Sequence, residues 1–252
     1  MNIEIKREKV IGILGGMGPY ATVDLFKKIL DLTPAKKDWE HLRIIIDNNP
    51  KIPSRGRYFA YGETNPSKEM ILTAQNLELA GADLIVIGCL TAHNFYQEVQ
   101  NNVKVPIINA VEETVKEIKR NNPDFKKIGL LSTEVTAESG LFQNEFIKQG
   151  LEIVVPDNEG LKEVRAIIET LKLNNIVESD NIKLSGIIKS LVNLGAEGII
   201  LGCSELPLMI KGDSYVIYNT NNNLDGNTES KIPVFDAMEI LVKEVIRRAK
   251  ED

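Results

Sequence analysis

Metal-binding and disulfide-forming residues are scarce in this chain. Its 252 residues include two cysteines, Cys89 and Cys203, and two histidines, His41 and His93. None of them shows the CxxC or HExxH spacing of common metal sites. Two cysteines are also too few for the disulfide scaffold of a small secreted domain. The sequence therefore predicts no metal site and no disulfide framework, and we expect both thiols to stay reduced.

Long apolar runs and a basic surface are missing as well. The first ten residues, MNIEIKREKV, lack the apolar core of a secretory signal. The longest apolar stretches, such as Leu84–Ile87, fall far short of the ~20 residues that span a bilayer. Lys and Arg number 30 against 36 for Asp and Glu, a net charge of −6, and an acidic chain binds nucleic acid and anionic membranes poorly. We therefore expect a cytoplasmic protein with no nucleic-acid or membrane partner.

Alternating strand and helix patterns are what the sequence does contain. Apolar residues make up 43% of the chain and charged residues 26%, the balance of a folded globular protein. Short runs rich in Ile, Val and Leu predict buried parallel strands at residues 10–14, 43–47, 84–88, 127–131, 153–155 and 199–202. Helical patterns lie at residues 21–32, 67–79, 110–121, 139–149, 161–173, 182–194 and 237–249. This alternation predicts three-layer α/β domains, with parallel sheets covered by helices.

The chain also repeats three landmarks in the same order. KVIGIL at residues 9–14 is answered by KKIGLL 117 positions later, and GADLIVIGC at 81–89 by GAEGIILGC 114 positions later. VPIINAVE at 105–112 is answered by IPVFDAME 127 positions later. The third offset exceeds the second by 13 residues, and the polar segment 219–230 predicts a surface-loop insertion there. We therefore expect two pseudo-symmetric α/β halves.

Each half places its single cysteine at the carboxyl end of a buried strand. Ligands bind at these strand ends in open α/β sheets, and in two pseudo-symmetric halves the cysteines can face each other across one cleft. A lone buried cysteine is often only a small apolar residue. Two cysteines at equivalent positions of a duplication instead point to chemistry: a disulfide, a metal, a nucleophile with a spare, or an acid with a base.

Symmetry favours the acid–base alternative. A thiolate on one face of a carbon atom and a thiol on the other can remove a proton and return it with inversion, as the interconversion of mirror-image molecules requires. A free thiol has a pKa of ~8.5, so one of the two must be shifted down to act as a base, and a helix N-terminus can shift it. Both cysteines are followed by segments that can begin a helix, CLTAH at 89–93 and CSELP at 203–207.

These motifs resemble the aspartate/glutamate racemase superfamily of cofactor-independent amino-acid racemases, and in particular its aspartate racemase branch. Further segments carry the likeness over nearly the whole chain: IGILGGMGP at 11–19, NNPKIPSR at 48–55, AGAD at 80–83, LST at 131–133 and LGCSE at 201–205. The resemblance implies racemisation of an acidic amino acid, most of all aspartate, with Cys89 and Cys203 as the two bases. It implies no pyridoxal phosphate, metal or other cofactor, and a homodimer.

The resemblance also implies a set of substrate-binding residues. They are Met17, Arg55, Leu90, Thr91, Thr133, Lys172, Ser204 and Glu205. Arg55, in a predicted loop, would bind the side-chain carboxylate of the substrate, because a planar guanidinium suits bidentate carboxylate binding. Lys51 and Arg57 are the alternatives to Arg55, and Lys162 is the alternative to Lys172.

Other interpretations compete with several of these assignments. The family usually has Asn where this chain has Leu90, so the substrate can differ from aspartate. Thr133 can cap a helix. His93, one turn beyond Cys89, is expected to serve packing or support rather than proton transfer. Glu205 can orient the substrate ammonium or tune the neighbouring thiol.

The Gly-rich segment GGMGP at 15–19 fits a loose form of the dinucleotide fingerprint. That fingerprint also needs an acidic residue ~20 positions further on, whereas the next strand ends only at Asp47. We therefore expect this loop to allow close backbone approach to a small carboxylate, or to be a plain tight turn.

We expect two domains with the active site in the cleft between them. By resemblance, the first comprises residues 1–106 and 218–252 and the second residues 107–217, so that the C-terminal helix packs on the first domain. A related isomerase or racemase with a different substrate is one competing hypothesis. A two-lobed small-molecule binding protein is another, which the missing export signal disfavours.

Overall fold

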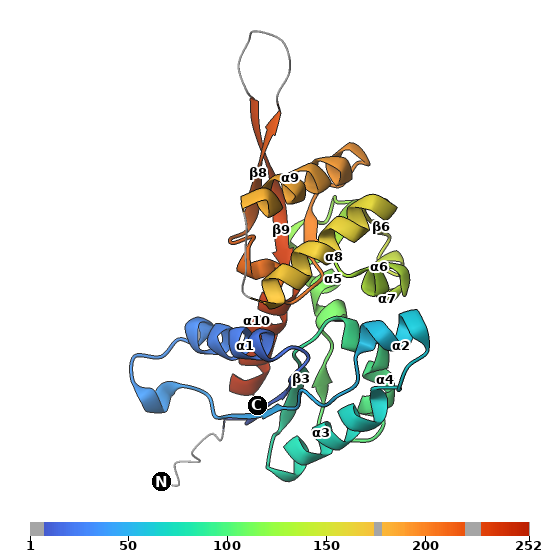
Figure 1. Cartoon of the computed structure of the whole chain (residues 1–252). Helices are drawn as coiled ribbons and strands as arrows, with labels where there is room; N and C mark the ends of the chain where they lie inside the picture. Colours follow the sequence, from blue (N-terminus) through green and yellow to red (C-terminus); the bar gives the residue numbers. More distant parts are fainter. Residues whose placement is uncertain (1–7, 174–177, 220–227, 252) are drawn as a thin grey trace. The chain divides into compact units, whose positions relative to one another are not determined.

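The computed structural model describes residues 8–173, 178–219 and 228–251 (Figure 1). The chain divides into two compact units, one comprising Met1–Glu113 and Met238–Asp252, the other Thr114–Ala237. Each unit is built on its own sheet of mainly parallel strands covered by helices. The predicted α/β fold class is therefore confirmed.

The first unit contains a parallel sheet in the order β2-β1-β3-β4. The strands are β1 (Ile11–Gly15), β2 (Ile44–Asn48), β3 (Leu84–Ile87) and β4 (Ile107–Ile108). Every residue of the central strands β1 and β3 is buried. Continuous aliphatic runs of this kind need cover on both faces of a sheet, and they explain why the predicted strand positions fall within one or two residues of the observed ones.

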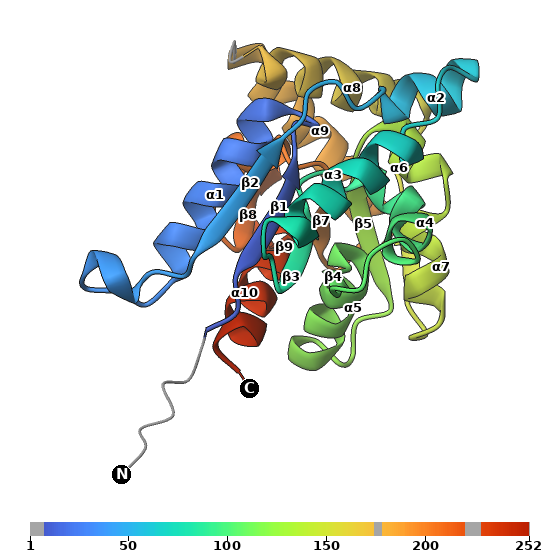
Figure 2. The same cartoon turned by 90° about the horizontal axis from the view of Figure 1, so that it is seen from below.

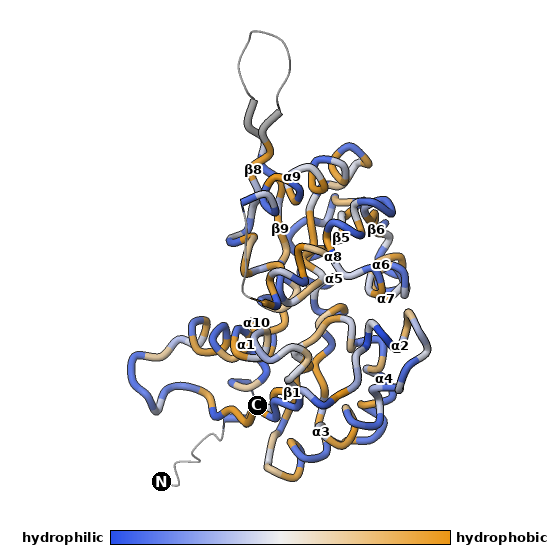
Figure 3. Tube along the Cα trace, in the orientation of Figure 1, coloured by the Kyte–Doolittle hydropathy of each residue, from blue (hydrophilic) through white to orange (hydrophobic). Residues whose placement is uncertain are grey.

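Helices supply that cover in the first unit. They are α1 (Pro19–Leu32), α2 (Arg55–Tyr61), α3 (Ser67–Leu79), α4 (Tyr96–Gln100), α10 (Ala237–Lys250) and the first turn of α5 (Ala110–Asn121). Two short 3₁₀ turns, η1 (Asp38–Glu40) and η2 (Thr91–Phe95), lie between them. α1 and α10 lie on one face of the sheet and α3 lies on the other (Figures 1 and 2). Along each helix, hydrophobic and hydrophilic residues alternate (Figure 3), as expected when one face packs on a sheet.

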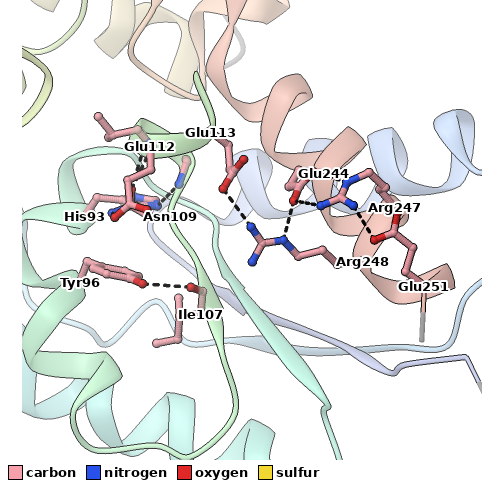
Figure 4. Close-up of polar contacts among 12 residues, drawn as sticks. His93, Tyr96, Ile107, Asn109, Glu112, Glu113, Glu244, Arg247, Arg248 and Glu251 are labelled. Carbon is pink, nitrogen blue, oxygen red and sulfur yellow. Dashed lines mark hydrogen bonds and ion pairs between the residues drawn. The ribbon is translucent and has the colours of Figure 1, made fainter. Parts of the chain in front are cut away.

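The C-terminal helix α10 makes polar contacts with the rest of the first unit. Arg248 donates one hydrogen bond to Glu113 at the start of α5 (3.0 Å) and another to Glu244 of its own helix (2.5 Å) (Figure 4). The hydrogen bond from Arg247, together with Arg248, lowers the pKa of Glu244 to about 2. The carboxylate therefore stays ionised well into the acidic range, where an ordinary glutamate becomes protonated.

The second unit contains a five-stranded sheet in the order β6-β5-β7-β9-β8. Its strands are β5 (Lys127–Leu131), β6 (Glu152–Val154), β7 (Ile199–Leu201), β9 (Thr228–Asp236) and the antiparallel β8 (Ser214–Asn219). Its helices are the rest of α5, α6 (Glu134–Glu138), α7 (Leu141–Ile147), α8 (Asn158–Lys172) and α9 (Glu178–Asn193), with the 3₁₀ turn η3 (Leu206–Leu208). α8 and α9 bury their apolar faces in one core with β5 and β7.

The internal repeat is visible in the strand registers. Gly12 pairs with Ile85 in the first sheet, and Gly129 pairs with Ile199 in the second. These are the same positions after offsets of 117 and 114 residues, which are the offsets of the sequence repeat. Four strands of the second sheet, β6-β5-β7-β9, therefore repeat the order β2-β1-β3-β4 of the first.

Two predicted features differ from the structure. The segment 219–230 is not wholly a loop, because Asn219 ends β8 and Thr228 begins β9, and the two residues pair in an antiparallel hairpin. Residues 220–227 lie outside the described residues. The compact units change after Glu113 and Ala237 rather than after 106 and 217. The second of these lies later because β9 pairs with β7 and so belongs to the second sheet.

Within residues 8–173, 178–219 and 228–251, no helix is both long enough and apolar enough to cross a membrane.

Candidate functional site

The same backbone contact fixes the position of the cysteine in each unit. Gly88, which precedes Cys89, donates its N–H to Leu14 O at the end of β1 (2.9 Å). Gly202, which precedes Cys203, donates to Leu131 O at the end of β5 (2.7 Å). Each cysteine therefore lies where its strand leaves the sheet, one residue beyond the glycine that donates a hydrogen bond to the neighbouring strand.

The turn that follows each cysteine is also the same. Ala92 N–H donates to Cys89 O and Leu206 N–H donates to Cys203 O, each at 3.2 Å. Both cysteine residues are 7% exposed, so each is almost buried without being sealed into the core. The two units thus hold their thiols in equivalent settings at the carboxyl ends of β3 and β7.

His93 supports the first turn. Its Nδ1 lies 3.0 Å from Cys89 O, and its Nε2 accepts a hydrogen bond from Ala110 N at the start of α5 (3.2 Å). A ring that accepts at Nε2 donates at Nδ1, so His93 is the neutral Nδ1–H tautomer. Burial lowers its pKa from 6.5 to about 4. His93, which lies beside the N-terminus of α5 in Figure 4, therefore links Cys89 to this helix, and neither nitrogen is left to act as a base.

Glu205 dominates the second turn. Cys203 Sγ donates to Glu205 Oε2 at 3.0 Å, and Ser204 Oγ donates to the same oxygen at 3.1 Å. Burial, followed by the charge of Glu205 and this hydrogen bond, raises the pKa of the Cys203 thiol well above its ordinary value. The second thiol is thus held in its protonated form.

Lys172 is the cation of the second unit that acts on Cys203. It is the last residue of α8, which packs against η3 just beyond Cys203. Its side chain is exposed, and its charge is among the influences that lower the pKa of Cys203. Lys162, the alternative from the sequence, instead pairs with Glu159 at 3.6 Å. Lys172 is therefore the lysine that acts electrostatically on the cysteine.

The Gly-rich loop after β1 packs against the loop after β2. Gly16 has a φ of +86°, and a Cβ there would lie 2.2 Å from the carbonyl carbon of Asn49. Thr22 Oγ1 accepts from Gly16 N (2.8 Å) and donates to Gly18 O (3.0 Å), which closes the turn onto α1. The close approach that demands glycine at position 16 is therefore an approach between two loops of the protein.

Arg55 joins the same two loops. It is the first residue of α2 rather than part of a loop, because Ser54 caps the helix by accepting from Arg57 N at 3.3 Å. Its guanidinium donates to Pro53 O (2.8 Å), Ile52 O (3.4 Å) and Met17 O (3.2 Å). Its Nε is buried and has no hydrogen-bond partner among the residues that the structure describes. Arg55 thus carries a positive charge and an unused donor at the carboxyl edge of the first sheet.

Three aromatic rings connect α2 with the turn after Cys89. Tyr58 and Phe59 of α2 pack on Phe95 of η2, with ring centroids 5.5 Å and 5.6 Å away. The helix that carries Arg55 and the turn that carries Cys89 are therefore packed together. Sequence reasoning missed these rings, although an aromatic pair three and four residues after a candidate binding arginine is a usable signal.

The other predicted site residues lie on the same edges of the two sheets. Met17 and Leu90 are buried at 4% and 1% exposure, whereas Thr91 is half-buried. Thr133 caps α6 by accepting from Thr136 N at 3.3 Å. The capping role considered for this residue is therefore present in the structure. Within the described part of the chain, no group of three His, Cys, Asp or Glu side chains could hold a metal ion.

Comparisons with known proteins find relatives of this chain in sequence and in fold. A model of the Asp/Glu/hydantoin racemase family matches residues 14–245. The broad specificity amino-acid racemase RacX of Bacillus subtilis (strain 168) is 30% identical over 241 residues, which cover 94% of this chain and 96% of RacX. The structure of Picrophilus torridus aspartate racemase has a TM-score of 0.76 at 28% identity and covers 97% of this chain and 95% of its own. An aspartate racemase homologue from Pyrococcus horikoshii OT3 has a TM-score of 0.73 at 31% identity, with 96% and 100% covered.

Proposed function

Because the chain belongs to the Asp/Glu/hydantoin racemase family, we propose that it racemises an acidic amino acid, with aspartate as the substrate and without pyridoxal phosphate or a metal. The observation that carries the proposal is the pair of cysteines, each 7% exposed and each held by the same glycine contact at the end of an equivalent strand. Membership of a racemase family disfavours the competing hypothesis of a binding protein. The cytoplasmic location and the homodimer remain predictions.

In the proposed reaction, the two thiols act on opposite faces of the substrate α-carbon. The Cys89 thiolate takes the α-proton of one enantiomer, and the electron pair of the broken C–H bond stays on the α-carbon. The Cys203 thiol then gives its proton to the other face, which leaves the inverted amino acid and a Cys203 thiolate. The opposite enantiomer follows the same steps in reverse.

Substrate binding is proposed to use the cationic and polar groups near the two cysteines. Arg55 and Lys172 would neutralise carboxylates, as an anionic ligand on an acidic protein requires. Met17, Thr91, Thr133 and Ser204 would contact the rest of the molecule.

Leu90 supports a second candidate, a racemase with a wider substrate range. Its side chain has no polar atom and is 1% exposed, so it offers no hydrogen bond where the family usually has Asn. RacX, the relative at 30% identity, is described as a broad specificity amino-acid racemase.

Proton exchange tests the proposed function directly. We expect purified protein without added cofactor to exchange the α-proton of L-aspartate in D₂O and to produce D-aspartate, as followed by NMR and chiral chromatography. L-Glutamate and L-alanine are the comparison substrates. Faster exchange in L-alanine than in L-aspartate would favour the wider range, and no exchange in any amino acid would exclude racemase activity.

Arg55 is expected to determine affinity for the second carboxylate. Replacing it with lysine keeps the charge but removes the planar fork, and a charge-assisted hydrogen bond contributes about 1.5–3 kcal/mol. We therefore expect Arg55→Lys to raise KM for aspartate roughly 10-fold or more, with a much smaller change for alanine. Arg57→Lys, in the same helix, is the matched control, because the Arg57 guanidinium is already paired with Glu63 at 2.7 Å. Equal losses for both substrates would limit Arg55 to its structural role between the two loops.

A further inference from the structure

The two cysteine turns are alike in backbone but not in charge. At the third position of the turn, the first unit has Thr91 and the second has Glu205, 114 residues later. Glu205 is 4% exposed, and its Oε2 accepts from Cys203 Sγ at 3.0 Å and from Ser204 Oγ at 3.1 Å. A buried carboxylate therefore touches one sulfur atom of the proposed pair.

This contact favours one protonation state of Cys203. A carboxylate accepts a hydrogen bond from a thiol, whereas ionising that thiol places two negative charges about 3 Å apart in a buried site. Like charges at such a distance disfavour the ionised form. The charged groups that face Cys203 are the Glu205 carboxylate in its own turn and Lys172 from α8. The carboxylate raises the pKa of Cys203, whereas Lys172 and the backbone hydrogen bond from Glu205 lower it.

We propose that Glu205 is a positioning residue that keeps the proton on Cys203, so that in the resting enzyme Cys203 is the acid of the pair. This inference rests on the proposed function, but it concerns only where the proton resides. When Cys89 takes the α-proton, the S–H bond of Cys203 breaks and a C–H bond forms on the other face. Cys203 is then a thiolate beside Glu205, and the reverse reaction restores its proton.

Titration of a single thiol tests the proposal without any substrate. In a Cys89→Ala variant labelled with [β-¹³C]cysteine, the NMR shift of Cys203 against pH reports its ionisation alone. Adding Glu205→Gln keeps a hydrogen-bond acceptor and removes the charge, so we expect the midpoint to fall by about one pH unit or more. Adding Lys172→Gln instead is expected to raise it. Glu159→Gln removes an exposed carboxylate of the same unit, 78% exposed, and is expected to leave the midpoint in place.

Activity gives a second readout in the chain that retains both cysteines. The basic limb of kcat/KM reports loss of the catalytic acid in the free enzyme, so Glu205→Gln is expected to move this limb down by the same amount as the midpoint. An unchanged or raised midpoint in Glu205→Gln would overturn the proposal. If circular dichroism shows that this variant is unfolded, Glu205→Thr, which copies the first turn, carries the same test. Failure of the racemase proposal would appear separately, as absence of α-proton exchange by the unmodified protein.

Discussion

Replacing either cysteine with alanine is expected to abolish net racemisation while leaving α-proton exchange in one enantiomer. With Cys203→Ala, Cys89 can still remove a proton and return one from solvent to the same face, so deuterium enters one enantiomer with retention. Cys89→Ala is expected to do the same for the opposite enantiomer. Loss of a small buried thiol costs about 1 kcal/mol of stability, so both variants should remain folded.

The measurement is NMR of L- and D-aspartate incubated separately with each variant in D₂O, with circular dichroism as the folding control. The double variant is expected to exchange neither enantiomer. Full racemisation by either single variant would exclude the mechanism with two thiols. Some other residue would then have to move the proton, and His93 is a poor candidate because both of its ring nitrogens are engaged with the backbone.

Acid is expected to destabilise the protein through His93. The ring is neutral and 3% exposed in the folded state, with a pKa of about 4 against an ordinary value of 6.5. The unfolded chain therefore binds a proton at a pH where the folded chain does not. The contribution of the neutral ring to the free energy of unfolding is complete above about pH 6.5 and is lost as pH falls toward about 4. The difference between these two pKa values corresponds to about 3 kcal/mol. Urea unfolding at about pH 7 and about pH 4 measures it.

His41, the other histidine of the chain, supplies the control. His93→Gln is expected to weaken the dependence of unfolding free energy on pH by about 3 kcal/mol over this range, and the same measurement on His41→Gln shows whether replacing a histidine elsewhere has such an effect. A His93→Gln protein with the full pH dependence would mean that other groups cause the acid loss.

Regular elements were predictable wherever local pattern and tertiary burial agree. The helices at residues 67–79 and 110–121 and the strand at 127–131 coincide with α3, α5 and β5. The helix α2 escaped prediction because it has seven residues and follows two prolines, so no apolar period develops. It depends instead on its Ser54 cap and on Gly62, whose φ of 66° ends it. Neither β8 nor β9 was predicted. The polar ends of these strands carry no strand pattern, and they are stabilised by pairing with each other.

The candidate site was predictable in its residue types but not in its contacts. The repeat predicts equivalent cysteines, and both glycine contacts follow from the matching registers. The sequence leaves Glu205 free to bind an ammonium or to tune Cys203, and only side-chain geometry shows its oxygen 3.0 Å from the sulfur. Likewise, a sequence cannot reveal that three carbonyl groups already occupy much of the Arg55 guanidinium.

The matching registers of the two sheets also bear on the ancestry of the chain. Residues that correspond in the sequence repeat also have corresponding pairing partners in the two sheets, as they would if one ancestral α/β unit had been copied and joined to itself. In an assembly of two identical chains, every substitution appears in both copies of a turn. Once the copies share one polypeptide, a substitution in one leaves the other unchanged. The third position of the cysteine turn, Thr91 in one copy and Glu205 in the other, is one place where the two copies differ in charge.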